Sequence, residues 1–117
     1  MLTTTEVTEL RAAVVAERDR TVTQIDALTR DLDEIVEASS LEPPDDEHDP
    51  DGPTIAWERE QIAALLTHAR EQLAALDRAE AELEAGTFGG CARCGGPIGF
   101  ERLMARPSAL HCISCAA

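Results

Sequence analysis

Four cysteines near the C-terminus constrain the fold of this chain more than any other feature. A two-residue spacer lets both thiolates of a Cys-x-x-Cys pair face one point, so two such pairs supply the four sulfur ligands of a closed tetrahedral Zn²⁺ site. Two disulfides or a thiol-redox pair would need a secretory signal or a thioredoxin-like βαβ pattern, and we find neither in the sequence. We therefore predict one structural zinc ion per chain. Its ligands are the only cysteines of the 117 residues, in two pairs seventeen residues apart: Cys91, Cys94, Cys112 and Cys115.

The rest of the composition favours long helices over a wide globular core. The aromatic residues are only Trp57, Phe88 and Phe100, with no tyrosine, so little bulk exists to fill a broad interior. No apolar run approaches the length of a membrane span, and the first residues lack both the basic and the apolar part of a secretory signal. We therefore expect a cytoplasmic protein with no membrane partner, in a compartment where reduced thiols bind metal.

Residues 5–38 show the periodicity of an amphipathic helix. Apolar side chains recur mostly at steps of three and four, charged residues fill the positions between them, and the first proline is Pro43. At 1.5 Å per residue, this helix would be about 50 Å long. Its apolar positions are Val7, Leu10, Val14, Val22, Ile25, Leu28, Leu32, Ile35 and Val36.

A cleaner heptad repeat covers residues 54–85. Pro53 suits the first position of a helix, and Gly86 suits the position just after its end. Apolar residues repeat every seven positions, with others four residues further on, which is the seam of a coiled coil. The seam consists of Ile55, Ile62, Leu66, Ala69, Leu73, Leu76 and Leu83.

The segment 39–53 interrupts the helical pattern between these two helices. Two consecutive prolines there cannot continue a helix, and six carboxylates with no basic residue lie from Glu42 to Asp51. Two helices of nearly equal length on either side of a short acidic tip predict an antiparallel coiled-coil hairpin over residues 1–85. The fold class is then mainly α, with a small Cys₄ zinc finger, residues 86–117, at the open end. The apolar residues that we expect to form the small core of the finger are Ile98, Phe100, Leu103, Met104, Leu110 and Ile113. We expect a monomer, because the proline breaks favour folding back over pairing of two chains.

Charge is divided unevenly between these two parts. Residues 86–117 carry three arginines against one glutamate, so the chain's net charge of −13 splits into +2 on the finger and −15 on residues 1–85. Binding to a phosphate backbone comes from Lys and Arg, so this distribution argues against DNA binding as the main activity. The finger arginines either pair with the acidic helices or contact a partner: Arg93, Arg102 and Arg106.

Four features of the finger occur together in one known family. They are the aromatic-Gly pair Phe88-Gly89, the Cys94-Gly95 step, the segment Arg102-Leu-Met-Ala-Arg-Pro107 and the spacing of the two cysteine pairs. In these features the chain resembles the DksA/TraR family of bacterial RNA polymerase-binding regulators. The hairpin with a carboxylate-rich tip extends the resemblance over most of the chain.

The resemblance implies a transcription regulator that binds RNA polymerase rather than a DNA sequence. In this family the hairpin enters the secondary channel of the polymerase, its tip approaches the catalytic centre, and the zinc end stays near the channel rim. Initiation is then modulated at individual promoters. The residues that this places in contact with the partner are Asp46, Asp49, Asp51 and Trp57 at the tip, and Arg93, Arg102 and Arg106 as possible rim contacts.

Trp57 has a second interpretation that needs no partner. As the single tryptophan, it falls beside the heptad seam near the tip, where it could pack against the first helix near Val36 or Leu41. A buried tryptophan at this position would stabilise the hairpin, whereas an exposed one would suit a contact with another protein.

The chain departs from the family in two places. The family's best-known tip pattern is Asp-x-x-Asp-x-Ala, and here Asp46 and Asp49 match its aspartates while Asp51 stands in place of alanine. Some members act together with the nucleotide ppGpp. We do not expect a ppGpp site here, because Gln72, Ala75 and Ala79 occupy the part of the second helix where a basic patch would help to hold the nucleotide.

Two other functions compete with this interpretation. The cysteine spacing is close to that of GATA-type DNA-binding fingers, but those are followed by a basic tail, and here only two alanines follow Cys115. Alternatively, the apolar seam could be intermolecular, which would make the chain a coiled-coil interaction module. An enzyme is not predicted, because the sequence offers no nucleophile–base pair, phosphate loop or open metal site.

Overall fold

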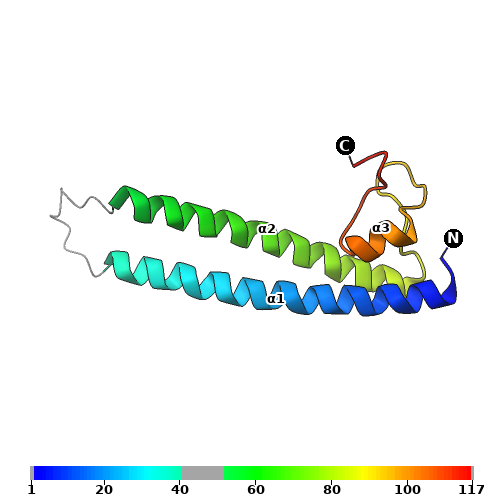
Figure 1. Cartoon of the computed structure of the whole chain (residues 1–117), viewed down its shortest axis with the longest axis horizontal. Coiled ribbons are helices and arrows are strands. Elements are labelled where there is room, and N and C mark those ends of the chain that lie inside the picture. The colour runs from blue at the N-terminus through cyan, green and yellow to red at the C-terminus, as the bar shows by residue number, and fades with distance from the viewer. Residues whose placement is uncertain (1, 41–51, 117) are drawn as a thin grey trace.

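Two long helices lie side by side and antiparallel, with the finger folded against one end of the pair (Figure 1). The computed structural model describes residues 2–40 and 52–116. Helix α1 spans Thr4–Ser40, α2 spans Gly52–Ala85, and the six-residue α3 spans Phe100–Ala105. The molecule measures 64 × 27 × 19 Å. The predicted fold class, a mainly helical hairpin with a C-terminal four-cysteine module, is confirmed.

Local hydrogen bonds fix where the long helices begin and end. At the start of α1, the backbone N–H of Thr3 donates to Glu6 Oε1 (2.9 Å) and the N–H of Glu6 donates to Thr3 Oγ1 (3.1 Å), which is a capping box. At the end of α2, Thr87 N–H donates to the Glu82 carbonyl (2.9 Å) and Gly86 has a φ of 76°. Glycine adopts this left-handed conformation without a Cβ clash, so Gly86 ends α2 at the residue predicted.

The hairpin seam is best buried in the half nearest the finger. There Val14, Leu76, Ala79 and Leu83 form one cluster of buried side chains, with Val7 and Phe88 packed against it. Further along, Leu66 and Ala69 of α2 are also buried. The remaining predicted seam residues between Val22 and Leu73 are half-buried, as expected where only two helices cover a seam. The prediction of Val36 as one of the apolar seam positions is wrong, because its side chain is 42% exposed.

A polar segment interrupts the seam near the middle of α1. Thr21, which the apolar pattern did not mark, is only 2% exposed and its Oγ1 donates to the Glu17 carbonyl (2.8 Å). Gln72 of α2 donates from Nε2 to Glu17 Oε1 (3.0 Å), and this hydrogen bond joins the two helices. Polar pairs of this kind favour one register of a coiled coil over its alternatives.

The finger shares its core with the first turns of α1. Leu10, Cys91, Ile98 and Leu103 are buried together, and Leu2, Phe88, Phe100 and Ala109 pack against them. The sequence correctly assigned Ile98 and Leu103 to the finger core. Two other assignments were wrong: Met104 is 40% exposed and Ile113 is 78% exposed.

None of the helices in the described residues is long and apolar enough to cross a membrane.

Candidate metal centre

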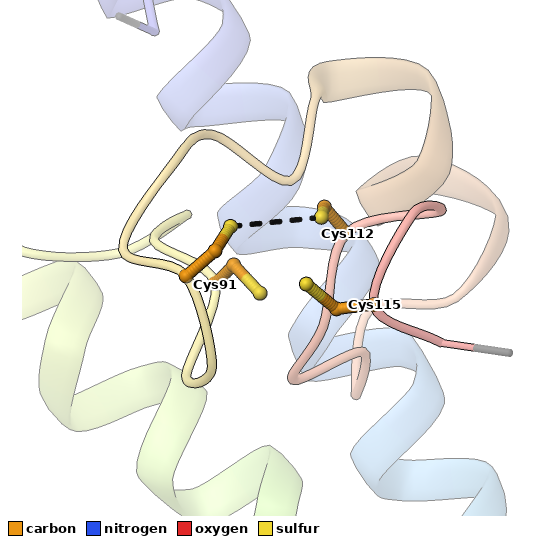
Figure 2. Close-up of side chains that lie close together, drawn as sticks. Cys91, Cys112 and Cys115 are labelled. Carbon is orange, nitrogen blue, oxygen red and sulfur yellow. Dashed lines mark hydrogen bonds between the residues drawn. The ribbon is translucent and has the colours of Figure 1, made fainter.

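The four cysteines converge on one point between two turns of the chain. Their sulfur atoms all lie within 4.8 Å of one another, and Cys94 Sγ lies 3.8 Å from Cys112 Sγ. Figure 2 shows the side chains of Cys91, Cys112 and Cys115 directed toward a shared space. All four thiols are free, so neither pair is a disulfide.

These sulfur separations fit a tetrahedral zinc ion. With zinc–sulfur bonds of about 2.3 Å, the sulfurs of a tetrahedral site lie about 3.8 Å apart. Each of the four corners is supplied by a cysteine, which is the donor set of a structural site with no open position. One zinc ion therefore fits the cluster, in agreement with the prediction.

The first cysteine pair sits in a turn that aims backbone N–H groups at sulfur. The N–H of Arg93 donates to Cys91 Sγ and the N–H of Gly96 donates to Cys94 Sγ, both at 3.4 Å. Gly95 has a φ of 74°, and a Cβ on Gly96 would lie 3.4 Å from Cys94 Sγ. Gly95 therefore allows a left-handed turn after Cys94 that other residues rarely adopt.

The second pair forms a similar turn, and one backbone bond joins it to the first. The N–H groups of Cys115 and Ala116 both donate to the Cys112 carbonyl at 3.0 Å. Ala92, inside the first turn, donates its N–H to the Leu110 carbonyl at 2.8 Å. This bond holds the segment before Cys112 beside the first turn.

The cysteine pKa values reflect the crowding of four sulfurs. Backbone N–H groups, that of Cys94 first, lower the pKa of Cys91 to about 5, because they stabilise its thiolate. Hydrogen bonding with the Cys112 side chain raises the pKa of Cys115 to about 12, and burial adds to this effect. Four negative sulfurs therefore do not coexist in this space unless a cation neutralises them, which is the chemistry of a metal site.

The three finger arginines occupy different environments. Arg93 and Arg106 are exposed and have no polar side-chain partner among the described residues. Arg102 is half-buried, and its Nε donates to the His111 carbonyl at 2.9 Å. None of the three pairs with the acidic hairpin within residues 2–40 and 52–116.

A surface groove runs along α3 beside two of these arginines. Its volume is about 690 Å³, and its lining includes Ile98, Phe100 and Ile113 together with Arg102 and Arg106. The sequence placed Ile113 in the core and so missed this groove.

The predicted tip residues are only partly covered by the structure. Asp46, Asp49 and Asp51 lie outside the described residues. Trp57 lies on the first turns of α2 and is 61% exposed, while Val36, one of its two suggested packing partners, is 42% exposed. Most of the Trp57 side chain is therefore open to contact with another protein, while Leu41, its other suggested packing partner, lies outside the described residues.

Comparison with known proteins agrees with the finger and with the fold. Residues 86–117 match the family model of the prokaryotic dksA/traR C4-type zinc finger. This finger belongs to the DksA/TraR family. The solved structure of transcription factor DksA2 from Pseudomonas aeruginosa is similar over 95% of this chain and 80% of its own, with a TM-score of 0.75 and 25% sequence identity. The expected DksA/TraR-type finger is thus confirmed for residues 86–117, and the expected DksA-like fold is confirmed over most of the chain.

A second relative has no assigned function. The chain is 42% identical over 64 residues to the uncharacterized protein YteA of Bacillus subtilis (strain 168). The match covers 55% of this chain and 27% of YteA, so the chain spans about a quarter of that relative's length.

Proposed function

We propose that this protein is a zinc-containing transcription regulator that binds RNA polymerase through the secondary channel and modulates initiation. The observation that carries the proposal is the similarity to transcription factor DksA2 over 95% of the chain, joined to a DksA/TraR-type finger. The hairpin and the finger thus resemble one regulator as a unit. The protein acts without sequence-specific DNA contacts, as a monomer and in the cytoplasm.

The metal has a structural role in this proposal. Cys91, Cys94, Cys112 and Cys115 hold one Zn²⁺, which neutralises the sulfurs and crosslinks the two turns. The finger buries few apolar side chains, so metal binding supplies much of the free energy that folds it. The folded finger in turn packs on Leu10 and so closes the open end of the hairpin.

The hairpin is the part that reaches the partner. A paired α1 and α2 in a molecule 64 Å long form a stiff, narrow probe, which suits entry into a channel. The acidic tip then approaches a Mg²⁺-centred site, where carboxylate oxygens of Asp46 and Asp49 act on a cation that prefers oxygen ligands. Exposed Trp57 contributes an aromatic contact near the tip. Around the finger, Arg93 and Arg106 are free to contact the channel rim.

In vitro transcription with purified polymerase tests the proposal. We expect the wild-type protein to change the yield of initiation at sensitive promoters, and Asp46→Asn and Asp49→Asn to reduce that change. Asp33→Asn, on the exposed face of α1, is the matched control and should act like wild type. If wild-type protein leaves initiation unchanged at every promoter tested, the proposed regulation is wrong. If both tip variants act like wild type, the tip has no part in it.

A gel-shift titration separates this proposal from a DNA-binding finger. A DNA-binding finger would give a gel shift whose affinity falls steeply with salt, because phosphate contacts release counterions. We expect no such shift, given the −15 charge of residues 1–85.

A ppGpp titration should leave the transcriptional effect unchanged, since Gln72, Ala75 and Ala79 supply no basic patch.

A further inference from the structure

Arg102 differs from the other finger arginines in being tied to the segment that leads into Cys112. Its Nε donates to the His111 carbonyl (2.9 Å), a bond that joins α3 to a residue nine positions further along the chain. The carbonyl that accepts this bond belongs to the residue directly before a cysteine of the cluster. The guanidinium therefore acts on the backbone of the metal site rather than on solvent.

Two consecutive carbonyls before Cys112 are held from outside the second turn. The Leu110 carbonyl accepts from Ala92 N–H (2.8 Å) in the first turn, and the His111 carbonyl accepts from Arg102. Inside the second turn, the recorded backbone bonds all go to the Cys112 carbonyl itself. They shape the turn but do not fix its direction relative to the first pair. Two external hydrogen bonds hold that direction, together with the packing of Cys112 and Cys115 against the buried finger cluster.

Arg102 is well placed to hold that direction, because α3 is itself anchored. Its neighbour Leu103 is 0% exposed and lies in the cluster with Leu10 and Cys91. Leu103 N–H donates to the Gly99 carbonyl (3.1 Å) and Arg106 N–H donates to the Arg102 carbonyl (2.8 Å), so this short helix is bonded at both ends. The α3 backbone therefore connects the packed end of the hairpin to the second cysteine pair.

We propose that Arg102 is a positioning residue of the zinc site. Its hydrogen bond to the His111 carbonyl orients Cys112 toward the other three sulfurs and slows loss of the metal. Hydrogen-bonding groups just outside the ligands of a metal orient those ligands. Removal of such a group changes metal affinity by about 10-fold to 100-fold. This inference rests on the zinc-binding part of the proposed function and is independent of any polymerase contact.

The experiment measures zinc release from the full-length, zinc-loaded protein to excess 4-(2-pyridylazo)resorcinol. Arg102→Met keeps most of the side-chain stem but removes the donor, and we expect release about tenfold faster than from wild type. Arg102→Lys keeps a donor on a stem of similar length and should release zinc more slowly than Arg102→Met. Arg11→Met, at an exposed position of α1 beside Leu10, is the control and should match wild type.

The comparison of the two Arg102 variants separates positioning from packing. Loss of stem packing alone would affect Arg102→Lys and Arg102→Met equally, so equal release rates for these two would overturn the proposal. Wild-type rates in Arg102→Met would overturn it as well. If wild-type protein itself binds no zinc, the proposed zinc site fails, and that result is distinguishable because it is seen before any variant is made.

Discussion

At the scale of single residues, the finger depends on backbone conformations that only some side chains allow. Gly89 is the clearest example: it has a φ of 104°, and a Cβ added there would lie 3.2 Å from Leu2 Cδ1. Its position between the long helices and the first cysteine explains the Phe88-Gly89 pair in physical terms. Phe88 packs against both buried clusters, and Gly89 lets the chain turn beneath Leu2.

Gly89→Ala should therefore destabilise the protein. Strain from the left-handed backbone and the close Leu2 contact together cost about 1–3 kcal/mol. Gly90→Ala is the matched control, because a Cβ at Gly90 meets nothing within 4 Å and its φ is not positive. Chemical unfolding of the zinc-loaded variants gives both values. Equal stability of the two variants would contradict this account of Gly89.

Removal of the metal should unfold the finger and spare the hairpin. Because the buried finger core is small and takes one side chain from α1, Leu10, chelation of zinc leaves most of α1 and α2 paired. Circular dichroism should then keep the signal of two long helices, while hydrogen exchange over residues 91–116 rises sharply. Complete loss of helical signal on chelation would show that the hairpin depends on the metal.

At the scale of elements, the helices could be predicted from the sequence and much of the finger could not. Heptad spacing, two prolines and Gly86 placed α1 and α2 to within two residues, because local propensity and seam packing agree there. Helix α3 was missed because six residues are too few for a periodic signal. Thr21 was missed because a hydroxyl that bonds its own helix can occupy an apolar seam.

The finger side chains show the limit of composition-based reasoning. Met104 and Ile113 are as apolar as Leu103, yet only Leu103 points into the core. A module this small has an interior for only a few side chains, and turn geometry decides which ones enter it. The Arg102–His111 bond had no sequence signal either, because it joins α3 to an irregular segment. The four cysteines were predictable because metal ligation imposes a fixed spacing.

The buried half of the hairpin seam should carry most of its stability. Leu76 is 0% exposed, so Leu76→Ala removes a packed side chain and should cost about 2–5 kcal/mol. Leu65 lies on the same helix but is 48% exposed, and Leu65→Ala should change stability by no more than about 0.5 kcal/mol. Thermal unfolding compares the two. A similar loss in both variants would contradict the observed position of the seam.

At the scale of the whole molecule, the zinc finger lies at one end of the helix pair, and the end of α1 and the start of α2 lie at the other (Figure 1). The finger end is held by buried contacts and by the cysteine cluster, so it fixes the open end of the hairpin. On the half of the hairpin away from the finger, the side chain of Trp57 is 61% exposed. The proposed function requires this arrangement, with the finger anchored at one end of the hairpin and a surface for contact with the polymerase at the other.

The central claim is that the far end of the hairpin enters the polymerase, and site-specific photocrosslinking tests it most directly. In one variant, a photoreactive amino acid replaces Trp57, near the tip. In a second variant, it replaces Val15, which is 44% exposed on the half of α1 nearest the finger. With core RNA polymerase, we predict that position 57 crosslinks to residues inside the secondary channel and position 15 does not reach them. Crosslinks from position 57 only to the outer surface of the polymerase, or none at all, would contradict the claim.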